Sequence, residues 1–184
     1  MNYDFTEDWL SYHLPLFQRY LARFRGDPCR VLEIGTFEGR TTLWLVENIA
    51  THAEARVETI DCLPNERFNA NLESSGWLRG RIIQHLGYSY KVLRELPLLS
   101  YDFIYVDGCH QQMHVMEDAV LAFRLLKIGG IMAFDDYEWS PWQQEDPIKP
   151  VLDSFLAAYR LDVEVLHKDY QLWIVKVMDR QTYV

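Results

Sequence analysis

The stretch "VLEIGTFEGRTT", residues 31–42, decides the fold. Its first four residues are typical of a buried strand, which ends at Gly35. Gly35 lets the backbone turn where a side chain would clash, and Gly39 lets the following helix begin close to a ligand. Amides at the start of a helix carry partial positive charge and suit a carboxylate or a phosphate. The stretch predicts a strand, a turn and a helix start around an anionic group, although such a turn can also be structural alone.

The spacing of the glycines disfavours a dinucleotide site. In the G-x-G-x-x-G pattern of NAD-binding proteins, the second and third glycines would stand at Phe37 and Arg40. A phenylalanine at this position would obstruct the close approach of a pyrophosphate. An NAD-dependent oxidoreductase is therefore disfavoured.

The rest of the chain alternates between predicted strands and predicted helices. Strands are expected at residues 29–34, 56–61, 81–85, 101–107 and 131–136. Helices are expected at residues 40–50, 65–74, 90–96, 111–127 and 148–159. Gly129 and Gly130 are predicted to stop the fourth of these helices, and residues 162–167 and 171–177 predict an antiparallel hairpin. This order predicts an α/β fold with a parallel sheet, covered on both faces, that binds ligands beyond the carboxyl ends of its strands.

A helix is also expected before the first strand. Steps of three and four predict one apolar helical face, made by Trp9, Tyr12, Leu16, Tyr20 and Phe24. Pro15 suits the start of this helix, and Gly26 and Pro28 suit its end. We expect residues 1–28 to form a helical cap on a single domain whose core spans residues 29–178.

Composition narrows the class of protein. A chain of 184 residues can form one domain with a substantial core. The net charge of −9 disfavours DNA or RNA as the main partner, because phosphate backbones are bound by Lys and Arg. The sequence has no apolar run near the roughly 18 residues of a membrane span and no signal peptide at its start. Three cysteines without a C-x-x-C pair predict a cytoplasmic, reduced protein.

Asp61 ends the second predicted strand, 22 residues after Gly39. A carboxylate at this position can accept hydrogen bonds from both hydroxyls of a ribose. It can equally cap a helix or form a turn before Pro64. Together with the Gly35 turn, it favours a nucleoside that carries a small anionic group, and S-adenosylmethionine is such a molecule.

Three segments carry a resemblance to a known family: "EIGTFEGRTTLWL", "DFIYVDGCH" and "LLKIGGIMAFDDY", residues 33–45, 102–110 and 125–137. The chain resembles class I S-adenosylmethionine-dependent methyltransferases. Within them it resembles a small methyltransferase-domain family that is similar to catechol O-methyltransferase-like and macrolide-sugar O-methyltransferases. The resemblance implies a three-layer Rossmann-like sandwich with a seven-stranded, mostly parallel sheet whose last strand is antiparallel.

The resemblance also implies which residues bind the cofactor. The methionine end would be lined by Glu33, Gly35, Thr36, Phe37 and Gly39, with added hydroxyls from Thr41 and Thr42. Asp61 would hold the ribose, and Asp107 would complete the cofactor site. The adenine would lie near Gly87, Tyr88 and Ser89, where many relatives carry an acidic residue in place of Tyr88.

Carboxylates and a histidine follow the fourth and fifth predicted strands. Asp107 and His110 follow the fourth, and Asp135 and Asp136 end the fifth. Three carboxylates in one cleft repel one another unless a cation lies between them, and oxygen ligands suit Mg²⁺. The sequence therefore predicts a metal site of Asp107, Asp135 and Asp136, with His110 as a general base. The resemblance to metal-dependent O-methyltransferases implies the same roles, whereas each residue alone is equally compatible with a cap, a turn or contact with the cofactor.

These residues together predict metal-assisted O-methylation of a small molecule, of sugar or phenol type. Residues 137–142, with three aromatic side chains, are expected either to cover the acceptor or to pack on themselves. A metal-independent N- or C-methyltransferase and a non-catalytic S-adenosylmethionine-binding domain are the alternatives. The family resemblance also implies a possible homodimer.

Overall fold

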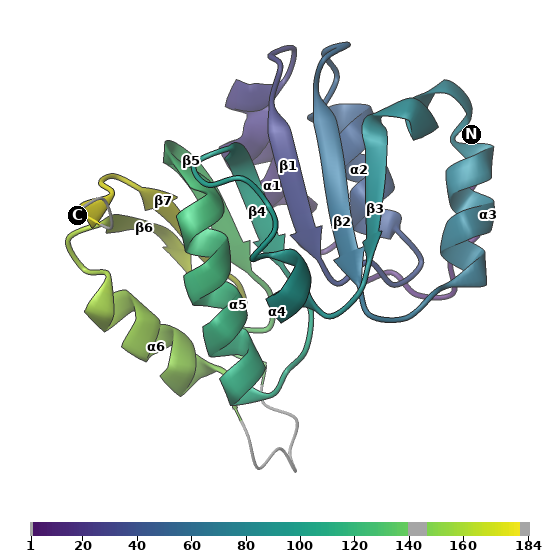
Figure 1. Ribbon diagram of the computed structural model, residues 1–184. Coiled ribbons are helices and arrows are strands. Elements are labelled where there is room, and N and C mark those ends of the chain that lie inside the picture. The colour runs from purple at the N-terminus through teal and green to yellow at the C-terminus, as the bar shows by residue number, and fades with distance from the viewer. Residues whose placement is uncertain (1, 140–146, 181–184) are drawn as a thin grey trace.

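In the computed structural model, which describes residues 2–139 and 147–180, seven strands form one sheet (Figure 1). The strands are β1 (Arg30–Ile34), β2 (Arg56–Asp61), β3 (Ile82–Leu86), β4 (Tyr101–Val106), β5 (Leu126–Phe134), β6 (Val163–Lys168) and β7 (Leu172–Lys176). Their order in the sheet is β3-β2-β1-β4-β5-β7-β6. The first five strands run parallel, and β7 is antiparallel to both β5 and β6. The predicted Rossmann-like sheet with an antiparallel last strand is confirmed.

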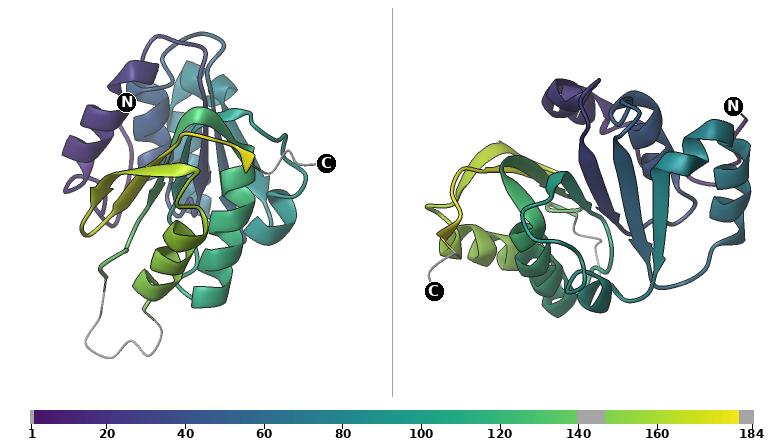
Figure 2. Two further views of the ribbon diagram at one scale, coloured as in Figure 1. Left: turned by 90° about the vertical axis from the view of Figure 1, so that its left-hand side faces the viewer. Right: turned by 45° about the horizontal axis from the view of Figure 1, so that its top comes forward.

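Helices cover both faces of the sheet (Figures 1 and 2). They are α1 (Leu14–Leu21), α2 (Arg40–Asn48), α3 (Glu66–Ser74), α4 (Ser89–Val92), α5 (Gln112–Leu125) and α6 (Lys149–Ala158), with 3₁₀ turns η1 (Ala22–Phe24) and η2 (Gly76–Arg81). Buried residues of α1 and α2 share one apolar cluster, and those of α5 and α6 share another on the opposite face. Within the described ranges, every helix is too short or too polar to cross a bilayer.

Local sequence explains several of these helix boundaries. The Asn65 side chain accepts hydrogen bonds from the amides of Arg67 and Phe68 and so caps the start of α3. Pro15 lies in the first turn of α1, as predicted. Helix α4 is shorter than the predicted 90–96, since it ends at Val92. Pro97 disfavours helical backbone at the residue before it, which limits any continuation of α4 toward residue 96.

The buried face of the N-terminal helix differs from the predicted one. Phe17 and Leu21 are fully buried in α1. Trp9 and Tyr12, which the spacing assigned to the apolar face, precede the helix and are 60% and 82% exposed. Because the helix begins only at Leu14, the helical spacing does not extend back to them.

The junction of α5 and β5 also differs from the prediction. The helix ends at Leu125, and the strand begins at once and runs through Gly129 and Gly130. The fully buried Lys176 ammonium donates to the carbonyl oxygens of Phe123 (3.0 Å) and Leu126 (3.1 Å). These carbonyls at the helix end are thus satisfied by a lysine of β7, so glycine is not needed to stop the helix.

Candidate active site

A cavity of about 1150 Å³ opens at the carboxyl ends of the parallel strands. One wall is formed by residues that follow β1, β2, β4 and β5, including Gly35, Asp61 and Asp107. Trp9 and His13, which precede α1, also line the cavity. The cavity lies where parallel α/β sheets bind their ligands.

The Gly35 turn has no room for a side chain. Gly35 has a φ of +93°, and a Cβ atom there would lie 1.8 Å from the carbonyl oxygen of Asp107. Gly39 has a φ of +80°, and a Cβ atom there would lie 2.2 Å from the ring of Phe68. Both glycines are therefore required by backbone conformation and by close packing.

Asp61 fixes the same turn. One carboxylate oxygen accepts hydrogen bonds from the amides of Thr36 (3.1 Å) and Phe37 (3.0 Å). The other accepts from the amide of Leu63 (3.1 Å). Asp61 also lines the cavity. Asp61 thus has the turn-forming role that the sequence offered as the alternative to a ribose contact. The ribose contact itself stays a prediction.

Glu33 lies beneath the turn and is 1% exposed. Its carboxylate accepts hydrogen bonds from the hydroxyls of Thr42 and Thr59. Burial raises the pKa of Glu33 to about 8, although both threonine hydrogen bonds act in the opposite direction. Close to neutral pH, this carboxyl group is therefore largely protonated in the free chain.

Most of the residues predicted to bind the cofactor line this cavity. They are Glu33, Gly35, Thr36, Phe37, Thr41, Asp61, Gly87, Tyr88, Ser89 and Asp107. Gly39 and Thr42 are absent from the wall. Gly39 is the N-cap residue of α2, directly before its first residue. The Thr42 hydroxyl donates a hydrogen bond to Glu33, and Thr42 is fully buried. Tyr88 is exposed and stacks on Tyr90, with ring centroids 5.8 Å apart.

A second group of residues lies in the same cavity. Asp107, His110 and Asp136 each offer one ligand atom, and these atoms lie within 4.8 Å of one another. The His110 Nε2 atom lies 3.0 Å from a carboxylate oxygen of Asp136. The other oxygen of Asp136 accepts a hydrogen bond from the Tyr170 hydroxyl (2.8 Å). Two carboxylates and an imidazole form a donor set that fits a divalent cation.

Asp135, the third aspartate of the predicted metal site, is not among these three residues, although it lines the same cavity. Its carboxylate accepts hydrogen bonds from the Tyr105 hydroxyl (2.8 Å) and the Gln171 amide (2.8 Å). The His13 Nε2 atom lies 3.8 Å from it. β5 ends at Phe134 and Asp136 has a φ of +56°, so the extended backbone does not continue through these two aspartates, and both of them line the cavity. A metal-binding role for Asp135 therefore stays a prediction.

The electrostatics of the group reflect its burial. Burial raises the pKa of Asp107 well above its usual range, and the neighbouring charges of Asp135 and Asp136 raise it further. The hydrogen bond to Asp136 raises the pKa of His110, while partial burial acts in the opposite direction. A bound cation would relieve the repulsion among these carboxylates, which supports the fit of the donor set.

Sequence reasoning missed several residues of the cavity wall, and His13 and Tyr170 are two of them. His13 is buried, and its ring stacks on Tyr170 with centroids 5.4 Å apart. Tyr170 lies in the turn between β6 and β7, far from the other site residues in sequence. No local pattern marks either residue, because only the packing of α1 and of the hairpin brings them to the cavity.

The aromatic segment after β5 divides between core and cavity. Tyr137 is fully buried, and its hydroxyl donates to Asp153 (2.7 Å), so it does not face an acceptor. Trp139 lines the cavity, and the centroid of its ring lies 5.0 Å from that of the His110 ring. Trp142 lies outside the described residues.

Residues 32–137 match the family model of a methyltransferase domain. The chain belongs to this family, and its fold and family define a class I S-adenosylmethionine-dependent methyltransferase. It is 28% identical to uncharacterized protein R132 of Acanthamoeba polyphaga mimivirus over 152 residues, which are 79% of this chain and 67% of that protein. It is 28% identical to O-methyltransferase hkm8 of Aspergillus hancockii over 117 residues, which are 62% of this chain and 45% of that protein. The chain thus spans less than half of hkm8.

Solved structures with low sequence identity share the fold. The O-methyltransferase of Bacillus cereus, in complex with S-adenosylhomocysteine, has a TM-score of 0.72 at 18% identity over 93% of this chain and 84% of that one. TomG of Streptomyces achromogenes, in complex with S-adenosylmethionine, has a TM-score of 0.70 at 20% identity over 90% and 78%. MycE of the mycinamycin pathway, in complex with Mg and S-adenosylhomocysteine, has a TM-score of 0.68 at 16% identity over 97% and 53%.

Proposed function

We propose that this chain transfers a methyl group from S-adenosylmethionine to a hydroxyl oxygen of a small molecule, with a divalent cation such as Mg²⁺ assisting. The observation that carries the proposal is the gathering of Asp107, His110 and Asp136 in the cavity that the Gly35 turn also lines. The turn that would bind the methyl donor and the residues that would bind the cation share one cavity. A donor and an acceptor bound there would be close enough to react.

The residues around the Gly35 turn fit a sulfonium donor by charge. Glu33, Thr36 and Phe37 would hold the methionine end, Asp61 the ribose, and residues 87–89 the adenine. A bound donor with a positive charge would favour the ionised forms of Glu33 and Asp107, which both line this cavity. When bound, S-adenosylmethionine supplies a methyl group that its sulfonium charge has already activated.

Asp107, His110 and Asp136 would hold the cation. When bound, the cation lowers the pKa of an acceptor hydroxyl, so that the oxygen is deprotonated near neutral pH. Tyr170 orients Asp136 through its hydrogen bond, and Trp139 contacts the ring of His110. The name of hkm8 supports oxygen as the acceptor atom, and the magnesium in MycE supports the cation.

The 3.0 Å contact between His110 and Asp136 favours a second candidate without metal. In that case Asp136 orients the imidazole and stabilises its protonated form, so that His110 itself takes a proton from the acceptor. This arrangement also suits a nitrogen or carbon acceptor. The two candidates differ in the role of the His110 Nε2 atom, which serves as a metal ligand in the first and as a base in the second.

A small-molecule acceptor is proposed because donor and acceptor must share the cavity of about 1150 Å³. Trp139 and Tyr12 offer ring faces to a sugar or a phenol. The acidic net charge of −9 supports this class of acceptor over a nucleic acid.

The test measures transfer of a radiolabelled methyl group to a panel of phenols and glycosides, with and without a chelator. Metal assistance predicts that chelation abolishes turnover and that added Mg²⁺ restores it, whereas the metal-free candidate predicts no change. Replacing His110 with alanine should reduce turnover by about 100-fold and leave binding of S-adenosylhomocysteine nearly unchanged. Binding of S-adenosylhomocysteine without transfer to any acceptor would instead support a non-catalytic binding domain.

A further inference from the structure

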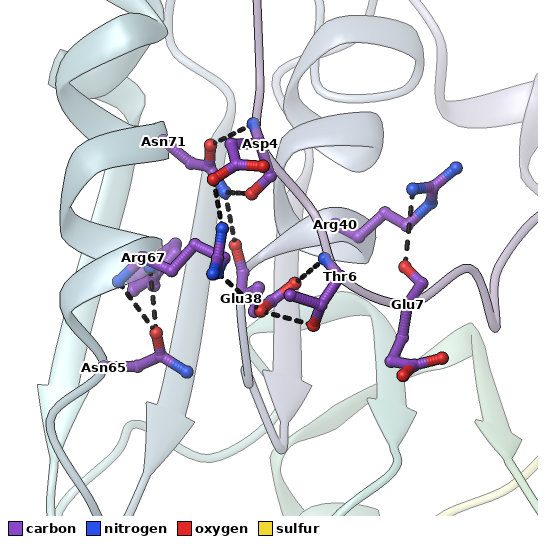
Figure 3. A network of polar contacts seen from close by, with 9 residues as sticks. Asp4, Thr6, Glu7, Glu38, Arg40, Asn65, Arg67 and Asn71 are labelled. Carbon is purple, nitrogen blue, oxygen red and sulfur yellow. Dashed lines mark hydrogen bonds and ion pairs between the residues drawn. The ribbon is translucent and has the colours of Figure 1, made fainter.

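The first residues of the chain form an arm, residues 3–9, that lies across α3 and the Gly35 turn (Figure 3). The arm ends at Trp9, which lines the cavity, and Glu7 and Asp8 also line it. Neither the family match, which begins at residue 32, nor the roles proposed above include this arm.

Glu38 anchors the arm to the turn. It is 5% exposed and lies in the same turn as Thr36 and Phe37. One of its carboxylate oxygens accepts a hydrogen bond from the Thr6 amide (2.7 Å), and the other accepts from the Thr6 hydroxyl (2.7 Å). The Arg67 guanidinium of α3 lies 2.9 Å from the same carboxylate (Figure 3). Hydrogen bonds to charged groups of this kind are among the stronger ones in proteins.

Asn71 of α3 joins the arm and the turn through one side chain. Its amide group donates to the carbonyl oxygens of Asp4 (2.8 Å) and Glu38 (3.1 Å). Its carbonyl oxygen accepts a hydrogen bond from the Asp4 amide (2.8 Å). Asn71 is 2% exposed, so these bonds are shielded from water (Figure 3). The position of the arm is therefore tied to the conformation of the turn.

Trp9 brings this connection to the cavity. Its ring stacks on Phe37, with centroids 5.2 Å apart and an angle of 29° between the planes. Both residues line the cavity, and the Phe37 amide is one of the three that donate to Asp61. A ligand seated on the turn therefore lies beside the end of the arm.

We infer that the arm is part of the donor site: Trp9 closes the pocket over Phe37, and Glu38 holds the arm in place, so that the arm and the nucleoside sulfonium donor stabilise one another. The inference rests on the proposed position of the donor at the Gly35 turn. A ligand that fixes the turn also fixes the arm, and an ordered arm slows the release of the ligand, because coupling between two sites is reciprocal.

The test compares Trp9→Ala with Trp77→Ala, using S-adenosylhomocysteine as the probe. Trp77 is 73% exposed, belongs to η2 and is outside the cavity wall, so it is a matched control. Calorimetry gives the affinity, and stopped-flow competition gives the dissociation rate. We expect Trp9→Ala to release the probe about tenfold faster and Trp77→Ala to behave as the parent chain does. Equal release rates in Trp9→Ala and the parent would overturn the inference.

A second measurement needs no substitution. Hydrogen exchange of the Asp4 and Thr6 amides in the parent chain should slow by at least about tenfold when the probe saturates the protein. Unchanged exchange at both amides under saturation would also overturn the inference, while leaving the proposed function intact. If the parent chain does not bind the probe at all, the proposed donor site fails instead, and the two outcomes are distinct.

Discussion

Replacing the buried Asp118 with asparagine should stabilise the protein at pH 8 and have little effect at pH 4. Asp118 of α5 is 2% exposed, and among the described residues its Oδ1 atom has no hydrogen-bond partner. Burial raises the pKa of Asp118 from its ordinary value of 3.8 to about 6, although a hydrogen bond with Ser89 acts in the opposite direction. At about 1.36 kcal/mol for each pH unit, this rise corresponds to a cost of about 3 kcal/mol for the ionised group.

The sign of the effect follows from the direction of the pKa. Below pH 3.8 the aspartate is protonated in both the folded and the unfolded chain, so it costs nothing. As the pH rises toward 6, the unfolded chain loses its proton first, and the free energy of unfolding of the parent falls. Asparagine has the same shape and does not ionise, so the variant escapes this loss.

Urea unfolding of the parent and of Asp118→Asn, measured at pH 4, 6 and 8, tests this expectation. The difference in the free energy of unfolding should be near zero at pH 4 and grow to at most about 3 kcal/mol at pH 8. Asp169→Asn, at an exposed position in the β6–β7 turn, is the control and should show no difference that depends on pH. An equal difference for Asp118→Asn at pH 4 and pH 8 would refute the reasoning.

Three further predictions concern the backbone and the helix ends. Gly35→Ala should lower the free energy of unfolding in urea by more than about 3 kcal/mol. Gly26 has a φ of +87° but open space around it, so Gly26→Ala should lower it by only about 1 kcal/mol. Lys176→Met should lower the free energy of unfolding by about 2 kcal/mol, because the carbonyls at the end of α5 lose their donor. Its control, Lys149→Met at the surface, should leave the melting temperature unchanged. Asn65→Ala should cost about 1 kcal/mol through loss of the α3 cap, and a variant as stable as the parent would contradict that role.

The sequence could predict the parts of this fold that depend on neighbouring residues. The apolar run before Gly35 and the alternation after it are local signals, and they predicted the alternation of strands and helices along the chain that the structure confirms. The residues at the strand ends were also within reach, because parallel strands bring their carboxyl ends to one edge. Asp61 and Asp107 therefore line the cavity as their positions in the chain predicted.

The sequence could not predict features that depend on distant contacts. The end of α5 is set by Lys176, which lies about 50 residues further along the chain. The hydrogen bonds of Asp135 depend on Tyr105 and Gln171, which lie 30 and 36 residues away along the chain. In each case the partner is distant in the sequence, so no short window of sequence contains both sides of the contact.

The Gly35 turn and Asp107 are parts of one backbone unit. The Asp107 amide donates to the Ile34 carbonyl (2.8 Å), and the Gly35 amide donates to the Ile60 carbonyl (2.9 Å). The Asp107 carbonyl in turn occupies the space that a side chain at Gly35 would need. A change in the turn must therefore move Asp107 as well, because β1 and β4 hold both residues at the same level of the sheet. For this reason a substitution at Gly35 cannot alter the turn without also altering the position of Asp107.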